Sequence, residues 1–350
     1  MNHLDKRIQN IPQKLWAIIN MVDELKGRWV GGASLNPQVL TRLKKSVLVT
    51  STGASTRIEG SGLSDEDVDR LIRGLTMQKF KDRDKQEVRG YYELLENIFS
   101  AYEKIAISES SIKHLHKELL KHVDKDTLHR GDYKKDENQV EMINGEGKSV
   151  AVIFATTPAL LTPKEMYDLM DWTRKSVDEK KIHPLIIIAN FIIEFLKIHP
   201  FEDGNGRLSR ILTNLLMLQY GYEYVPYISH EKLIEDNKPE YYVALRQSQK
   251  TFKTENEDIF AWLEFFLNIS LTQAKEAIAL LSKENIEKLL SPKQLLVWQY
   301  LLSVPEATPG DISKSAKVAR PTVSQALDTL LRLKKVERIG QGRTTRYKKT

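Results

Sequence analysis

The chain has 350 residues and a mass of 40.3 kDa, a length typical of two or three domains. Hydrophobic residues make up 41% of the sequence and charged residues 29%, which excludes a wholly disordered chain and a fibrous repeat. The chain has no cysteine, which excludes disulfides, thiolate-bound zinc, iron–sulfur clusters and thiol nucleophiles.

The positive charge is concentrated near the C-terminal end. Residues 292–350 hold twelve Lys and Arg against four Asp and Glu, a net charge of +8, whereas the whole chain carries +6. The first 291 residues therefore carry −2. A basic module on a near-neutral body predicts a polyanionic partner for that module alone.

Most of the chain has the periodicity of α-helices. In chain order, helices are predicted after Pro12 and over residues 37–58, 64–75, 86–104, 111–123, 163–180, 184–198, 205–220, 239–248 and 256–290. The second of these is expected to be interrupted or to end between Gly53 and Gly60. A strand, a turn and a strand over 139–154 predict the one clear β-hairpin of the first 290 residues.

Neither a signal peptide nor a membrane span is expected. The first residues lack an apolar segment, and the apolar stretch 185–198 is too short and too polar to cross a bilayer. We therefore expect the protein in a reducing cytoplasm. The pair Ser291-Pro292 marks the expected boundary before the basic module.

A segment suited to chemistry follows the predicted helix 184–198. It has the sequence HPFEDGNGRLSR over residues 199–210. Gly204 and Gly206 remove side chains around Asn205, so that backbone N–H groups can approach a ligand closely. The next helix begins here, and its N-terminus adds unpaired N–H donors with positive partial charge. The segment therefore predicts a cradle for an anion.

Four side chains of the same segment extend this prediction. Arg207 and Arg210 lie on one helical face and suit phosphates, while Asp203 could hold Mg²⁺ against them. His199 can accept a proton near neutral pH. Each feature alone is commonly structural, but together they indicate phosphoryl or nucleotidyl transfer. The chain lacks GxxxxGK[ST], which excludes a P-loop.

This segment resembles the Fic-family motif HxFx(D/E)GNGRxxR. It matches every fixed position: His199, Phe201, Asp203, Gly204, Asn205, Gly206, Arg207 and Arg210. The wider sequence resembles the family from about residue 84 to residue 270. The resemblance implies a mainly α fold, a Fic-type helical bundle in which the hairpin is a flap that holds the target. It also implies an adenylyltransferase that moves AMP from Mg-ATP to a Ser, Thr or Tyr hydroxyl of a protein.

The resemblance assigns roles to the matching residues. His199 would be the general base, Phe201 would pack under the loop, and Asp203 would coordinate Mg²⁺ between the α- and β-phosphates. Arg210 would grip the γ-phosphate, and Gly204 to Gly206 would form the anion hole with Arg207 on the phosphates. The full expected ATP-binding set is Asp203, Gly204, Asn205, Gly206, Arg207, Leu208, Ser209, Arg210, Tyr241, Tyr242 and Gln249. The expected target-binding residues of the flap are Met142, Ile143 and Asn144. For the two tyrosines, stacking on adenine and packing in the core both remain open.

A second motif, STRIEG over residues 55–60, resembles the family's inhibitory motif (S/T)xxxE(G/N). Ser55 and Glu59 lie on one face of a helix, and Gly60 can end that helix in a left-handed turn. The resemblance places the chain in the class with an N-terminal inhibitory helix, in which Glu59 would pair with Arg210. An ordinary helix end with a solvated Glu59 is the alternative.

The basic module resembles a winged helix-turn-helix. Helices are predicted over 293–303, 308–315 and 322–333, followed by two short strands around residues 340–342. The expected DNA-binding residues are Arg320, Thr322, Ser324 and Gln325 in a major groove and Arg343 and Arg346 on phosphates. A module that mediates only protein contacts or dimerisation is the alternative.

The sequence thus predicts an N-terminal helical region (1–83), a Fic catalytic domain with following helices (84–290) and a winged helix-turn-helix (291–350). The expected cofactors are ATP and Mg²⁺, and the expected partners are a protein substrate and duplex DNA, with a homodimer left open. Two other functions remain open. One is a DNA-binding regulator whose Fic domain senses nucleotide, and the other is a Fic enzyme that removes AMP or uses another phosphate-group donor. The sequence does not identify the target protein or the modified residue.

Overall fold

The computed structural model describes residues 2–349 except 33–36, 75–81, 144–148, 253, 334 and 341–344. Contacts between residues divide the chain into two compact units, Met1–Ile278 and Ala279–Thr350. The division falls within one continuous helix, α12 (Phe260–Leu289). The sequence placed this boundary after residue 290, where the next helix begins.

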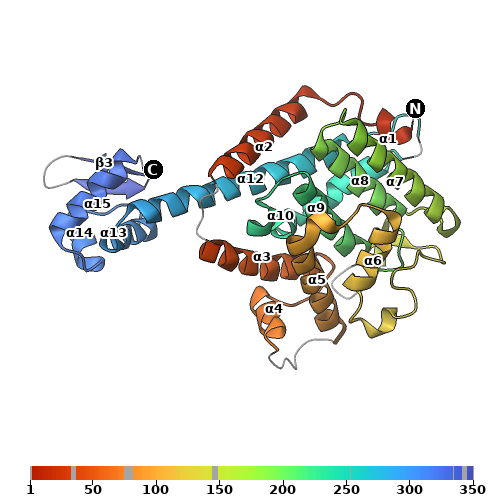
Figure 1. Ribbon diagram of the computed structural model, residues 1–350, viewed down its shortest axis with the longest axis horizontal. Coiled ribbons are helices and arrows are strands. Elements are labelled where there is room, and N and C mark those ends of the chain that lie inside the picture. Colours follow the sequence, from red (N-terminus) through yellow and green to blue (C-terminus); the bar gives the residue numbers. More distant parts are fainter. Residues whose placement is uncertain are drawn as a thin grey trace. The chain divides into compact units, whose positions relative to one another are not determined.

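The first unit is built almost entirely of helices, as predicted from the sequence (Figure 1). Besides α12 they are α1 (His3–Lys6), α2 (Gln13–Gly32), α3 (Pro37–Ile58), α4 (Asp65–Ile72), α5 (Asp82–Ala101), α6 (Glu109–Leu119), α7 (Thr162–Glu179), α8 (Pro184–Ile198), α9 (Asn205–Gln219), α10 (His230–Asp236) and α11 (Lys238–Gln249). Short 3₁₀ turns are η1 (Tyr102–Lys104), η2 (Asp124–Asp126), η3 (Ala159–Leu161) and η4 (Val225–Tyr227). The predicted mainly α class is therefore confirmed.

Helix α8 is the centre of this unit. Every residue from Leu185 to Ile198 is buried, as expected for a helix that is apolar on all sides. Its start is fixed by Pro184, whose ring presets the helical φ angle, and by the His183 side chain, which accepts a hydrogen bond from the Leu185 N–H. Helices α7 and α9 pack against α8. The loop that follows α8 is therefore attached to a helix that is buried along its length.

The predicted hairpin is present. Strands β1 (Gln139–Ile143) and β2 (Ser149–Ala155) are antiparallel, with Gln139 opposite Ala155 and Ile143 opposite Ser149. Met142 and Ile143 lie on β1, whereas Asn144 lies outside the described residues. The hairpin lies between η2 and η3 in the chain, and β2 packs against α11.

Some of the helices differ in detail from the prediction. Helix α3 ends at Ile58, within the predicted interval from Gly53 to Gly60, and it passes through Gly53 without a break. A Cβ at Gly53 would lie 2.6 Å from both Arg57 Nη1 and Asp65 Oδ1. Glycine at this position therefore serves close packing. Helix α10 was not predicted, since its seven residues give almost no periodic signal. Helix α12 begins at Phe260 instead of residue 256.

The second unit has its own hydrophobic core. It contains α13 (Pro292–Ser303), α14 (Pro309–Ser315) and α15 (Arg320–Arg332), followed by the antiparallel strands β3 (Val336–Ile339) and β4 (Arg346–Lys349). Reciprocal capping boxes at Ser291 and Thr308 explain where α13 and α14 begin. Trp298, Leu327 and Tyr347 are among the side chains that form this core.

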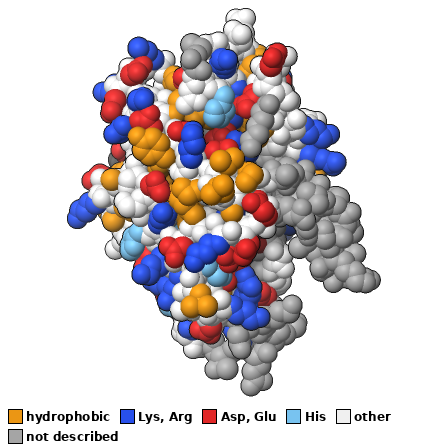
Figure 2. Space-filling model, turned by 90° about the vertical axis from the view of Figure 1, so that its right-hand side faces the viewer, with side chains coloured by type: hydrophobic (Ala, Val, Ile, Leu, Met, Phe, Trp, Pro, Cys, Tyr) orange, Lys and Arg blue, Asp and Glu red, His pale blue; other side chains and the backbone are white. Residues whose placement is uncertain are grey.

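The surface is polar, with charges of both signs. Figure 2 shows one face, on which Lys, Arg, Asp and Glu side chains surround a cluster of hydrophobic ones. In the described part of the chain, no helix combines the length and apolarity needed to cross a bilayer.

Candidate active site

His199 occupies the C-terminal cap of α8 in a left-handed conformation, with φ +51° and ψ +60°. Its N–H donates to Phe195 O at 2.9 Å, and its Nδ1 lies 3.3 Å from Leu196 O. A carbonyl can only accept, so Nδ1 carries the proton and Nε2 holds the free lone pair. Burial lowers the pKa of His199 to about 4. The imidazole is therefore a neutral base at physiological pH.

Phe201 and Asn205 hold the loop in shape. Phe201 is fully buried and stacks on His116, with ring centroids 3.8 Å apart. The Asn205 side chain accepts from the Phe201 N–H at 3.0 Å and donates to the Phe201 carbonyl at 2.8 Å. Both the oxygen and the nitrogen of the Asn205 side chain are therefore engaged inside the loop. Asn205 can contribute to an anion site through its backbone N–H.

Helix α9 begins at the glycine pair. Gly204 is its N-cap and has φ +78°, a conformation that favours glycine. The N–H groups of the first turn have no carbonyl partner within the helix and can bind an anion. A Cβ at Gly206 would overlap the Glu59 carboxylate. Leu208 and Ser209 are buried, and the Ser209 hydroxyl donates to Gly206 O at 2.7 Å.

Asp203 lies in a ring of four charged side chains. Its Oδ2 accepts from Arg207 at 3.0 Å and from Arg83 at 2.5 Å, while its Oδ1 accepts from the Gly204 N–H at 2.6 Å. Glu87 completes the ring, at 2.7 Å from Arg207 and 2.8 Å from Arg83. Burial favours the neutral acid, but Arg207 and the Gly204 N–H overcome it and lower the pKa of Asp203.

This ring contains two residues that the sequence analysis missed. Arg83 and Glu87 lie on α5, about 120 residues before the loop in the chain. Their i, i+4 spacing is the only local signal, and it is common on solvent-exposed helices.

Asp203 suits a magnesium ion that arrives with phosphate oxygens. Mg²⁺ prefers oxygen ligands and commonly takes one or two protein carboxylates together with substrate phosphates and water. The Asp203 side chain is 37% exposed beside the helix N-terminus, where phosphates would bind. Among the described residues, no cluster of three acidic or His side chains offers a metal cage built of protein alone.

Glu59 reaches the same site from α3. Its Oε1 accepts from Arg210 Nη2 at 2.8 Å, and Ser55 holds the same guanidinium through its Oγ at 2.8 Å and its carbonyl at 3.0 Å. Gly60 has φ +99°, and the N–H groups of Gly60 and Ser61 donate to the last carbonyls of α3, at Arg57 and Thr56. This turn aims Glu59 at the start of α9.

The charges of Glu59 and Arg210 stabilise one another. Burial opposes ionisation of the carboxyl, but Arg210 and Arg207 lower the pKa of Glu59. Burial likewise opposes the charge on Arg210, but Glu59 raises its pKa. Arg210 is 2% exposed, so Glu59 is the anion that compensates its buried charge.

The two tyrosines of α11 have different environments. Tyr241 is buried against Tyr242, Trp262 and Phe265, with ring centroids 5.2, 6.0 and 5.7 Å away. Burial raises its pKa to about 12. Tyr242 is only half-buried, and besides burial the Glu59 charge raises its pKa. Both tyrosines therefore lie near Glu59 and Arg210, and the Tyr241 hydroxyl also forms a hydrogen bond with the Arg210 side chain.

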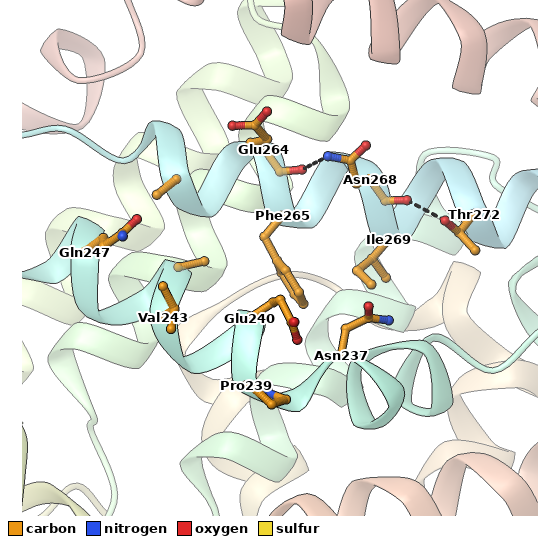
Figure 3. Close-up of a pocket in the computed structure, with 12 residues that line it drawn as sticks. Asn237, Pro239, Glu240, Val243, Gln247, Glu264, Phe265, Asn268, Ile269 and Thr272 are labelled. Carbon is orange, nitrogen blue, oxygen red and sulfur yellow. Dashed lines mark hydrogen bonds between the residues drawn. The ribbon is translucent and has the colours of Figure 1, made fainter.

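Gln249, at the end of α11, is 7% exposed, and neither polar atom of its side chain has a hydrogen-bond partner in the described structure. A separate groove of about 460 Å³ runs between α11 and α12. Figure 3 shows its lining, which includes Val243 and Phe265 and none of the predicted site residues.

The residues predicted to bind DNA belong to the second unit. Arg320, Ser324 and Gln325 are exposed and Thr322 is half-buried, all on α15. Arg346 on β4 pairs with Glu306 at 2.6 Å. Arg343 lies outside the described residues.

The fold and the site together define a class of helical proteins. In this class a histidine ends a buried helix, and a glycine loop leads into the next helix, whose N-terminus can bind an anion. Known proteins resemble this chain in sequence and in fold. The Fic/DOC family model matches residues 106–217. A Fido domain-containing protein from Dictyostelium discoideum is 33% identical over 106 residues, which are 29% of this chain and 69% of that protein. The chain belongs to the Fic/DOC family.

Two other relatives are named as adenylyltransferases. Protein adenylyltransferase Fic from Drosophila willistoni is 30% identical over 125 residues, 35% of this chain and 22% of that protein. A probable protein adenylyltransferase from Aquifex aeolicus is 35% identical over 94 residues, 26% of this chain and 28% of that protein. The chain thus matches less than a third of the length of either.

Solved structures share the fold. A Fic family protein from Desulfovibrio desulfuricans G20 aligns over 97% of both chains, with a TM-score of 0.63 and 24% identity. A Fic domain containing signaling protein from Bacteroides thetaiotaomicron aligns over 75% of this chain and 97% of its own, with a TM-score of 0.61 and 24% identity.

Proposed function

We propose that this chain transfers AMP from Mg-ATP to a Ser, Thr or Tyr hydroxyl of a target protein, and that Glu59 restrains the transfer. The observation that carries the proposal is that one short loop holds both a neutral His199, with a free Nε2, and the first turn of α9, whose N–H groups have no carbonyl partner within the helix. Transfer from ATP needs both a base for the incoming hydroxyl and a cradle for the phosphates. The names of the adenylyltransferase relatives support this reaction.

Each group then has one task. His199 Nε2 takes the hydroxyl proton while the hydroxyl oxygen bonds to the α-phosphorus, and the bond to the bridging oxygen breaks to release pyrophosphate. The N–H groups of α9 and the two guanidiniums bind the phosphate oxygens. Asp203 would hold Mg²⁺, which would supply charge neutralisation at the phosphates. Tyr242 and the unpartnered amide of Gln249 are available to the nucleoside.

Glu59 restrains this reaction by occupying Arg210. The same guanidinium would have to bind the γ-phosphate for the α-phosphorus to face the target. The Glu59 carboxylate also lies over Gly206, where phosphate would approach the helix N-terminus. Two negative groups cannot share this position, so ATP is admitted only in an unproductive pose.

The test incubates the Glu59→Gly chain with a cell lysate and Mg²⁺, in parallel with α-labelled and γ-labelled ATP. Protein label that depends on the added chain is expected from α-labelled ATP alone, because AMP carries the α-phosphate and the γ-phosphate leaves. The lysate without the chain measures γ-label from its own kinases. His199→Ala in the same background should lower α-labelling by about 10²–10⁴-fold and leave ATP binding in place. An increase of γ-label on adding the chain would instead show a phosphoryl transferase, and no increase of either label would refute the proposal.

For the second unit we propose a winged helix-turn-helix that binds duplex DNA. The supporting observation is the exposed polar face of α15, in a module with a net charge of +8. Such a helix can enter a major groove, while basic side chains of the hairpin contact phosphates. A regulator whose Fic domain senses nucleotide would use the same module, and it would bind ATP without labelling any protein.

A further inference from the structure

Lys134 is a lysine buried beside the catalytic loop. Lys134 is 3% exposed, and burial lowers the pKa of its ammonium group to about 8. An ammonium group has three N–H donors, and here each has an acceptor. They are Asn138 Oδ1 at 2.7 Å, Thr156 Oγ1 at 2.9 Å and Ile198 O at 3.2 Å. All three acceptors are uncharged oxygens, and the charges of Glu137 and Glu165 also act on the ammonium group and favour its charged form.

The three acceptors come from three separate segments. Asn138 directly precedes β1, Thr156 directly follows β2, and Ile198 is the last residue of α8 before His199. One ammonium group therefore joins both ends of the hairpin to the base of the catalytic loop. Thr156 and Asn138 also bond directly, with the hydroxyl 2.7 Å from Asn138 O.

Further hydrogen bonds strengthen this junction. The Lys134 N–H donates to Pro200 O at 2.8 Å, and Asn138 Nδ2 donates to Phe201 O at 2.9 Å. The stem of the hairpin is thereby attached on both sides of His199. The carbonyls at 198, 200 and 201 thus accept hydrogen bonds from Lys134 and Asn138, two residues of the segment that leads into β1.

The same contacts complete the end of α8. The last carbonyls of a helix need partners outside it. His199 itself occupies those of Phe195 and Leu196, the Thr157 N–H binds Lys197 O at 3.3 Å, and Lys134 binds Ile198 O. A cation is favoured at this negative end of the helix dipole. Without Lys134, the carbonyl adjoining the histidine would lose its donor.

We infer that Lys134 is a positioning residue that locks the stem of the hairpin to the His199 loop. It thereby keeps the hairpin and the imidazole in one fixed relation for an incoming target hydroxyl. The inference rests on the proposed function, in which the hairpin holds the target. Positioning of the target and binding of ATP should respond differently to changes at Lys134, because none of its side-chain contacts reaches the anion cradle at the start of α9.

The test compares Lys134→Met with Lys135→Met, a matched control that removes an exposed lysine one residue away. All variants are made in the full chain carrying Glu59→Gly. Three quantities are measured: amide hydrogen exchange over residues 139–155, the affinity for Mg-ATP by calorimetry, and self-labelling with α-labelled ATP. Lys134→Arg tests rescue by a second long cation, and Thr156→Val tests the loss of one acceptor should the methionine variant not fold.

We expect Lys134→Met to speed exchange in the hairpin at least tenfold and to lower labelling at least tenfold, with Mg-ATP affinity changed less than threefold. A misplacement of about 1 Å at a reacting group is enough for such a loss of rate. Lys135→Met should change nothing, Lys134→Arg should recover most of the labelling, and Thr156→Val should show a smaller effect of the same kind.

Unchanged hairpin exchange in Lys134→Met would overturn the inference. So would a loss of Mg-ATP affinity as large as the loss of labelling, because it would indicate general damage to the site. If the Glu59→Gly parent labels nothing, the proposed function fails, and hydrogen exchange alone then decides whether Lys134 locks the hairpin.

Discussion

Replacing Glu59 with glycine should activate transfer. The substitution removes one charge-assisted hydrogen bond, the 2.8 Å contact to Arg210 Nη2. It leaves the two contacts from Ser55, at 2.8 and 3.0 Å, so the guanidinium should keep its place and face the phosphates. The variant should therefore gain an available arginine without losing the geometry of α9.

The size of the effect follows from that single bond. Hydrogen bonds to charged groups contribute about 1.5–3 kcal/mol. The Glu59 side chain is 36% exposed, so solvent screening favours the lower end of that range. About 1.5 kcal/mol corresponds to a rate increase of roughly tenfold, which we take as the minimum.

The assay is self-labelling with α-labelled ATP, measured as an initial rate for four chains: wild type, Glu59→Gly, Arg210→Ala and the double variant. Arg210→Ala should cancel the gain, because the freed arginine produces it. Glu59→Gln keeps the shape and removes the charge, and should fall between wild type and Glu59→Gly. A Glu59→Gly rate no higher than that of wild type would refute the inhibitory role and leave the assignment of His199 untouched.

Three further predictions use other parts of the structure. Because the pKa of His199 is lowered to about 4 and only the neutral imidazole can take a proton, labelling by Glu59→Gly should stay level from pH 8 to about 5 and fall towards pH 4; a decline centred near pH 6.5 would contradict this. Arg83→Ala should lower the Mg²⁺ concentration needed for half-maximal labelling, because Asp203 Oδ2 then loses one of its two guanidinium donors; an unchanged Mg²⁺ titration would show that Arg83 and Mg²⁺ do not compete. The full chain should bind duplex DNA with an affinity that falls steeply with salt, and a chain ending at residue 291 should not; equal binding by both at low salt would favour protein contacts for the second unit.

The sequence predicted the parts of the site that depend on neighbouring residues. The bounds of α8 follow from a proline start, an apolar run and the His-Pro pair, and the turn after Ile58 follows from Gly60. Helix α10 has only seven residues, and no local signal showed that Gly53 packs against Arg57 and Asp65. Helix α10 depends on packing against α3, and Gly53 on packing against the start of α4, and a periodicity contains neither contact.

The sequence also does not show which distant residues contact those of the motif. The motif names Asp203, but only the fold brings Arg83 from α5 to the same carboxylate oxygen, at 2.5 Å. In the proposed mechanism, Arg83 occupies part of the carboxylate that would hold the metal, and Glu59 occupies the guanidinium that would bind the γ-phosphate. Both Arg83 and Glu59 precede the matched segment 106–217. We therefore expect the family motif to define which groups act, and the helices before it to set how readily those groups become available.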